Sequence, residues 1–272
     1  MRSILRSLIR SLPRLHALLF ALLLSFTIVR PAAAIDFVDF TDLWYSVGED
    51  AWGVNFDQSY NFIFATFYIY GSDQQPTWYT AHLTKGPNDV WSGPLNRTTG
   101  TYFGAPWSNA DITLAQVGTA TFTPSSSYAG TLTYNVGSVN VAKVITRLTL
   151  TRIPLGGDYS GAIVSIFSNC NNPADNGTVR SFVNLKATQT AGGQLQLDFT
   201  SSGGTCRMAG AYIQDGQLYR VPNGAYTCGV AAFASTVALS QVKQTAQGIE
   251  GQWVAPISLG CVESGYFSAV LD

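Results

Sequence analysis

Tryptophan and cysteine occupy different halves of this chain, and that division constrains the fold more than any other feature. Five of the six tryptophans lie between Trp44 and Trp107, and all four cysteines lie between Cys170 and Cys261. Large rings stabilise a fold by burial, whereas disulfides stabilise it by restricting the unfolded chain. We therefore expect an aromatic-rich domain over 35–153 and a disulfide-containing domain over 154–272, with the boundary in the Ile153–Gly157 segment.

The first 34 residues have the pattern of a signal peptide. Four arginines precede an apolar run from Leu15 to Val29, and Ala32-Ala33-Ala34 follows as a cleavage site. The run is shorter than the roughly 20 residues that a membrane-spanning helix needs. We expect cleavage after Ala34, export to the periplasm or the cell exterior, and no membrane span in the processed chain.

The charge that remains after residue 34 argues against a nucleic-acid partner. Ten Lys and Arg face 16 Asp and Glu, a net charge of −6. Such a chain has nothing to attract a phosphate backbone.

Alternating side chains predict strands nearly everywhere. Asn61–Tyr70 places Ile63, Ala65 and Phe67 on one face, and 194–200 places Leu195, Leu197 and Phe199 on one face. No stretch after Ala34 shows helical periodicity. The sequence predicts an all-β fold of two consecutive antiparallel meander domains, each a small up-and-down barrel or a barrel-like sandwich.

The cysteines predict two disulfides in an oxidising compartment, with three possible connectivities. If the second domain closes so that its first and last strands pair, Cys170 and Cys261 meet at one rim. Cys206 and Cys228 flank a hairpin, and a bulge near Pro222 would bring them opposite each other. We therefore expect Cys170–Cys261 and Cys206–Cys228. No C-x₂-C pair suggests a metal site, so we expect neither metal nor cofactor.

Side chains suited to catalysis are scarce. His82 is the one histidine after residue 34, and no glycine-rich loop of the phosphate-binding kind is present. Asp42, Glu49, Asp50 and Asp57 form an acidic group near the start of the first domain. A carbohydrate-active enzyme could use Glu49 with Asp50 or Asp57 as an acid pair, but turn capping and solubility explain these acids more simply.

Aromatic residues beside glycine or proline are the better candidates for a binding site. Sugars or apolar ligands could stack on them if they line a barrel mouth or a sheet face, although packing of the barrel ends is the simpler interpretation. The candidate ligand-binding residues are Trp44, Trp52, Trp78, Tyr79, Trp91, Trp107 and Glu49.

Several short motifs in this half occur in a fixed order. Among them are Leu43-Trp44-Tyr45, Glu49-Asp50-Ala51-Trp52-Gly53, Pro76-Thr77-Trp78-Tyr79, Trp91-Ser92-Gly93-Pro94 and Ile145-Thr146-Arg147. Over about residues 42–152 the series resembles a segment of exported proteobacterial proteins of unknown function, which typically reads L-W-W-N-P-x-E-S-G-W-G-x-N. The chain departs from that segment at Ser46-Val47 and at Asp50-Ala51. The resemblance implies an exported β-protein and brings no activity with it.

Three functions remain open at this point. We favour an exported, non-enzymatic binding or interaction module that recognises a glycan or a small apolar ligand through aromatic strand ends. The alternatives are the carbohydrate-active enzyme and a structural or surface-associated protein whose ligand is another protein.

Overall fold

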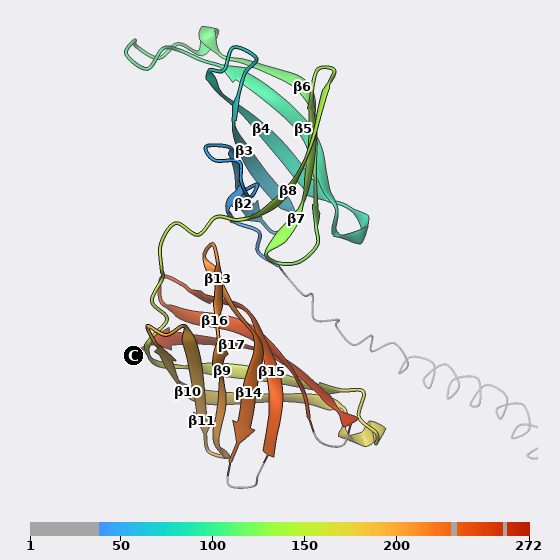
Figure 1. The fold of residues 1–272 in the computed structure, drawn as a ribbon, viewed down its shortest axis with the longest axis vertical. Coiled ribbons are helices and arrows are strands. Elements are labelled where there is room, and N and C mark those ends of the chain that lie inside the picture. Colours follow the sequence, from blue (N-terminus) through green and yellow to red (C-terminus); the bar gives the residue numbers. More distant parts are fainter. Residues whose placement is uncertain (1–37, 230–232, 258–259) are drawn as a thin grey trace, which may run out of the picture. The chain divides into compact units, whose positions relative to one another are not determined.

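The computed structural model describes residues 38–229, 233–257 and 260–272, so the expected signal peptide lies outside the described residues. The described chain is all-β and forms two consecutive closed antiparallel barrels of eight strands (Figure 1). No described helix is long and apolar enough to cross a membrane.

The first barrel is an up-and-down meander in which each strand pairs with the next and β8 pairs with β1. Its strands are Asp42–Tyr45 (β1), Gly53–Ser59 (β2), Phe62–Tyr70 (β3), Pro76–Lys85 (β4), Trp91–Thr99 (β5), Thr113–Pro124 (β6), Ala129–Val136 (β7) and Val139–Arg147 (β8).

The second barrel follows the linker 148–156 and has the neighbour order β12-β11-β10-β9-β17-β16-β15-β14, closed by pairing of β12 with β14. The short strand β13 extends only β14. The strands are Gly157–Ser168 (β9), Gly177–Gln189 (β10), Gln194–Ser201 (β11), Gly204–Ala211 (β12), Ile213–Asp215 (β13), Leu218–Cys228 (β14), Phe233–Gln244 (β15), Gly248–Pro256 (β16) and Val262–Leu271 (β17).

In both barrels, side chains at every second position of a strand fill the interior, as the sequence predicts. Ile63, Ala65 and Phe67 are buried in the first barrel, and Leu195, Leu197 and Phe199 are buried in the second. The first core is dominated by rings: Phe122 lies 5.0 Å from Phe56 and 5.2 Å from Phe40, centroid to centroid.

Two strands differ from the expectation. The glycine and proline beside Trp91 predict a strand end or a turn; Trp91 does begin β5, but Gly93 and Pro94 lie within the strand and form no turn. Gly93 permits this, because a Cβ there would lie 1.8 Å from the carbonyl oxygen of His82. The segments 217–221 and 225–230 were expected to be separate strands, but Leu218–Cys228 is one strand with register shifts between Tyr219 and Gly224. These register shifts are the bulge that was expected near Pro222 to bring Cys206 and Cys228 opposite each other.

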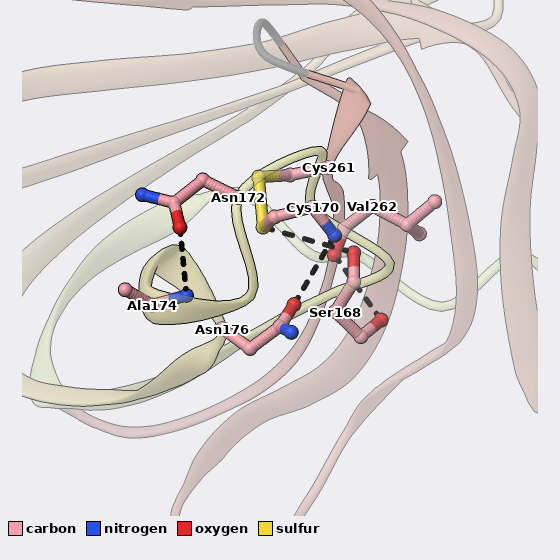
Figure 2. Close-up of a disulfide and its surroundings, with 7 residues drawn as sticks. All are labelled: Ser168, Cys170, Asn172, Ala174, Asn176, Cys261 and Val262. Carbon is pink, nitrogen blue, oxygen red and sulfur yellow. Dashed lines mark hydrogen bonds between the residues drawn. A yellow bond between two sulfur atoms is a disulfide. The ribbon is translucent and has the colours of Figure 1, made fainter.

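Both expected disulfides are present. Cys170 is bonded to Cys261 and Cys206 to Cys228, and the second pair lies directly opposite in the β12–β14 ladder. The first pair follows the β9–β17 ladder, in which Tyr159 pairs with Leu271, one residue from the expected partner Asp272. Figure 2 shows the Cys170 N–H donating to Asn176 Oδ1 at 3.1 Å, which anchors the adjoining loop.

Each disulfide joins strands that are not consecutive in the chain. β9 and β17 are the first and last strands of the second barrel, and β12 and β14 are separated by β13. The corresponding seam of the first barrel, between β1 and β8, has only two ladder positions, Trp44 with Arg147 and Tyr45 with Thr146.

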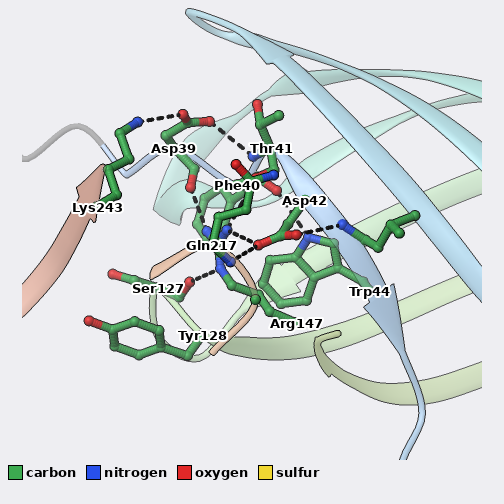
Figure 3. Close-up of polar contacts among 12 residues, drawn as sticks. Asp39, Phe40, Thr41, Asp42, Trp44, Ser127, Tyr128, Arg147, Gln217 and Lys243 are labelled. Atoms are coloured by element: carbon green, nitrogen blue, oxygen red, sulfur yellow. Dashed lines mark hydrogen bonds and ion pairs between the residues drawn. The ribbon is translucent and has the colours of Figure 1, made fainter. Parts of the chain in front are cut away.

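A buried arginine reinforces that seam (Figure 3). The Arg147 guanidinium donates to Asp42 Oδ2 at 3.1 Å, to Thr41 O at 3.2 Å and to Ser127 O at 2.8 Å, and it also reaches Asp39 O. Its carbon Cζ lies 4.9 Å from the centre of the Trp44 ring. Burial lowers the pKa of Arg147, and the Asp42 carboxylate offsets part of that effect.

The same carboxylate also binds the second barrel. The Gln217 N–H, in the turn between β13 and β14, donates to Asp42 Oδ2 at 2.9 Å, and the Gly216 N–H donates to Thr149 Oγ1 at 2.9 Å. Lys243 Nζ lies 3.2 Å from Asp39 Oδ2, and the Gln241 N–H donates to the Tyr128 hydroxyl at 2.9 Å. We call this set of contacts the junction.

Candidate functional site

Large apolar side chains are exposed at one end of the first barrel. In an antiparallel meander the β1–β2, β3–β4, β5–β6 and β7–β8 connections all emerge at the same end. The Arg147 seam and the junction involve the opposite end, where β8 finishes. Exposed apolar residues in or next to the four connections are Val47, Tyr68, Tyr70, Trp78, Tyr102, Phe103, Trp107, Ile112, Leu114 and Val139.

One group of these residues lies on the outer surface of the β3–β4 pair. Tyr68 on β3 lies directly opposite Trp78 on β4, and Tyr70 continues the row. Each of the three is 51 % exposed. Phe64, two places before Thr66 on the same face, is also exposed, and its ring lies 5.5 Å from the His82 ring. We call Phe64, Tyr68, Tyr70 and Trp78 the aromatic face.

Polar groups surround the aromatic face on its neighbouring strands. Asn55 and Asp57 of β2 point outward, opposite Thr66 and Phe64 of β3. Thr80 of β4 lies opposite Asn96 of β5, and both are buried although they belong to outward positions. The face thus combines half-exposed rings with amide, hydroxyl, imidazole and carboxylate groups that can donate or accept hydrogen bonds.

The second group occupies the long β5–β6 connection. Figure 1 shows this connection extending as an arm beyond the neighbouring turns. Phe103 is 94 % exposed, Trp107 71 % and Tyr102 67 %. We call residues 100–112 the aromatic arm.

The barrel mouth between these surfaces is filled by its own contacts. Glu49 forms an ion pair with Lys143, whose Nζ lies 5.5 Å from the centre of the Trp52 ring. Trp52 hydrogen-bonds the Tyr134 hydroxyl, and burial raises the pKa of that phenol. Tyr79 packs partly buried against the same core. Glu49, Trp52 and Tyr79 therefore close the mouth in this structure.

The candidate aromatic residues thus divide into three environments. Trp44 and Trp91 are each 1 % exposed inside the barrel, so neither can contact a ligand on the surface. Trp52 and Tyr79 lie at the mouth with Glu49. Trp78 belongs to the aromatic face and Trp107 to the aromatic arm. The structure does not bring all seven candidates into one site.

The acidic group is also dispersed. Asp42 is buried against Arg147, Glu49 is paired with Lys143, and Asp57 lies on the outer face of β2. Asp57 lines an open groove of about 440 Å³ with Gln217 and the linker residues Leu148 and Leu150. Nothing in these surroundings pairs Glu49 with Asp57 as an acid and a base. Within the described ranges, no three His, Cys, Asp or Glu residues are grouped as a metal ion would require.

Sequence reasoning missed the pairing within the aromatic face and two buried ionisable residues outside the site. Tyr68 and Tyr70 were assigned to one face of a strand, but alternation alone could not say that Trp78 lies opposite Tyr68. Arg147 was seen only as part of a short motif. In the second barrel Glu263 is buried beside the Tyr226 hydroxyl, 3.5 Å away, and its inward position follows from the alternation of β17.

Comparison with known proteins adds no assignment. No protein-family model matches the chain, and no curated protein matches it either. The resemblance of residues 42–152 to a segment of exported proteobacterial proteins stays a prediction, and the function has to be inferred from the geometry.

Proposed function

We propose that this protein is an exported binding module that holds a glycan chain against the aromatic face of its first barrel. The observation that carries the proposal is the register pair Tyr68–Trp78, in which both rings are half-exposed on the outside of a closed barrel. Rings in that position are outside the buried core, and exposed aromatic side chains gathered on one face are typical of an interaction site.

The chemistry of the surface favours a sugar over a purely apolar ligand. Aromatic rings can pack against the C–H face of a pyranose, while neighbouring amide, hydroxyl and imidazole groups bond its hydroxyls. Asn55, Asp57 and His82 supply such groups beside Phe64. Small apolar ligands prefer concave sites that enclose them, whereas an extended chain can lie along an open sheet.

Export is part of the proposal and rests on two features. Residues 1–34 have a basic, apolar and small-residue order typical of a signal peptide. The two disulfides fit an oxidising compartment outside the cytosol. We infer a periplasmic or extracellular protein on these grounds.

A binding titration tests the proposal. The processed chain, residues 35–272, would be titrated with soluble neutral polysaccharides, namely xylan, mannan, dextran and a β-glucan, and followed by tryptophan fluorescence and calorimetry. We expect one class to bind, and Trp78→Ala or Tyr68→Ala to weaken binding by about tenfold each, because a lost ring contact removes roughly 1.4 kcal/mol.

Trp107→Ala is the matched control, since it removes an exposed tryptophan that lies outside the aromatic face. It should bind like the unaltered chain. Absence of binding across all four polysaccharides, or binding that survives the Tyr68→Ala/Trp78→Ala double variant, would contradict the proposal.

A further inference from the structure

The aromatic arm is the most exposed apolar feature of the described chain, and the aromatic face does not include it. Tyr102, Phe103 and Trp107 project from the tip, and Ile112 and Leu114 continue the apolar surface along the returning strand. Residues 98–110 contain no Asp, Glu, Lys, Arg or His. An apolar surface without charge would be costly to leave in water unless it had a partner.

Hydrogen bonds hold the arm in one conformation. The Ser108 N–H donates to Thr101 Oγ1 at 2.9 Å, and the Ala105 N–H donates to Tyr102 O at 2.9 Å. Below the tip, the hydroxyls of Thr99 and Thr113 lie 2.6 Å apart. The rings are therefore displayed in advance, so a partner need not order the loop on binding.

Two further side chains of the arm have hydrogen-bond partners within it. Trp107 Nε1 donates to Asn109 Oδ1 at 2.9 Å, and the nearest carboxylate, Asp111, accepts from Thr101 Oγ1 at 2.9 Å. The Tyr102 and Phe103 rings lie 4.6 Å apart. The arm thus presents a small cluster of rings on a stem in which Thr101 is hydrogen-bonded to Ser108 and Asp111, and Thr99 to Thr113.

We propose that the aromatic arm inserts into the headgroup–acyl boundary of a lipid bilayer and tethers the protein to a membrane surface. A projecting tip needs a partner that can deform around it, and the bilayer interface does so without a complementary groove. Tryptophan and tyrosine are the residues enriched at that depth, because their rings are apolar and their edges are polar.

The charge of the chain and of the arm indicates which lipid headgroups the arm should bind. The processed chain has a net charge of −6, and the tip carries no Lys or Arg. Attraction to anionic headgroups is therefore excluded as the driving force, and the arm should bind neutral bilayers through apolar burial. Binding should be insensitive to salt, because screening does not weaken an apolar contact.

Vesicle partition tests this inference. Residues 35–272, which contain both closed barrels and lack the apolar segment 15–29, would be mixed with phosphatidylcholine vesicles and sedimented. We expect the Tyr102→Ser/Phe103→Ser/Trp107→Ser variant to partition at least about tenfold less than the unaltered chain, since it removes all three rings whose burial would drive the partition. Vesicles containing phosphatidylglycerol should bind no better than neutral ones.

The aromatic face supplies a matched control. Tyr68→Ser/Tyr70→Ser/Trp78→Ser removes two single rings and one indole, like the arm variant, and should leave partition unchanged. The same variant should lose glycan binding while the arm variant keeps it, so failure of one proposal is separable from failure of the other.

Brominated phosphatidylcholine locates the contact. It should quench the fluorescence of Trp107 in the unaltered chain and have no effect on the arm variant. Equal partition of the arm variant and the unaltered chain, or equal losses in both triple variants, would overturn the inference.

Discussion

At the scale of single residues, Arg147 shows how the first barrel tolerates a buried charge. Its guanidinium donates to Asp42 and to the carbonyl groups of Thr41 and Ser127, and its Cζ lies 4.9 Å from the centre of the Trp44 ring. A planar fork of five donors suits this arrangement, whereas a lysine offers a point charge with three donors. At the β1–β8 seam, Arg147 therefore has the closing role that a disulfide has in the second barrel.

Arg147→Lys should reduce the free energy of unfolding by about 2 kcal/mol, because three ammonium donors cannot serve all four acceptors of Arg147, and at least one of these is left buried without its partner. Urea titration would measure the change. Arg207→Lys is the control, since Arg207 binds Asp198 at an exposed position and should have a much smaller effect. Equal losses in the two variants would contradict the role given to Arg147.

At this scale the sequence could predict which side chains of a strand point into the barrel, but not which tryptophans are exposed. Alternation correctly placed Ile63, Ala65 and Phe67 inward. Trp91 and Trp107 both stand near a glycine and a proline, yet Trp91 is buried and Trp107 is exposed. The difference depends on whether the glycine lies within a strand, as Gly93 does, or in a connection, as Gly104 does. The residue types around a tryptophan do not show which of these two positions its glycine occupies.

At the scale of strands, the two barrels solve the same closure problem by different chemistry. A meander forms its consecutive pairs through short turns, but its seam joins strands far apart in the chain, which costs loop entropy. In the second barrel a disulfide joins each non-consecutive pair of strands. In the first barrel the seam depends on a short ladder and on Arg147.

The two disulfides should therefore differ in their contributions. Loop-entropy arithmetic gives about 4.6 kcal/mol for a closed loop the length of Cys170–Cys261 and about 3.4 kcal/mol for one the length of Cys206–Cys228. The sequence separations are 91 and 22 residues. Replacing each pair by alanine and measuring chemical unfolding should show the larger loss for Cys170/Cys261; the reverse order would show that strain or residual structure dominates.

The strands and the cysteine pairing followed from the sequence because both depend on period and on spacing. The bulge near Pro222 also followed from the sequence, but the continuity of β14 across it did not. β14 pairs with β15 on both sides of the bulge, and this pairing keeps residues 218–228 in one strand.

At the scale of the whole molecule, the junction joins the two barrels through backbone N–H groups of a turn that has no room for a side chain at Gly216. Gly216 has a φ of +62°, and a Cβ there would lie 2.1 Å from Asp42 Oδ2. Only glycine can hold that conformation at so close an approach. The turn between β13 and β14 therefore fits the Asp42–Arg147 pair because it has no side chain at this position.

Gly216→Ala should loosen the junction. Gly137→Ala is the control, because Gly137 has a φ of +57° but nothing within 4 Å of the added methyl group. Backbone strain alone should cost the control about 1 kcal/mol, whereas Gly216→Ala should lose roughly 2 kcal/mol more through overpacking. Faster tryptic cleavage after Arg152, in the linker, should accompany the loss in Gly216→Ala only. Similar cleavage rates in the two variants would show that the junction does not restrain the linker.

The central claim is that the aromatic face, and not the barrel mouth or the aromatic arm, contacts a glycan. Oxidative labelling of the tryptophans, read by mass spectrometry with and without the polysaccharide that binds best, tests it most directly. We predict that Trp78 is labelled in the free protein and protected in the complex, that Trp107 is labelled in both, and that Trp44 and Trp91 are labelled in neither. Unchanged labelling of Trp78 with protection of Trp52 or Trp107 would contradict the claim.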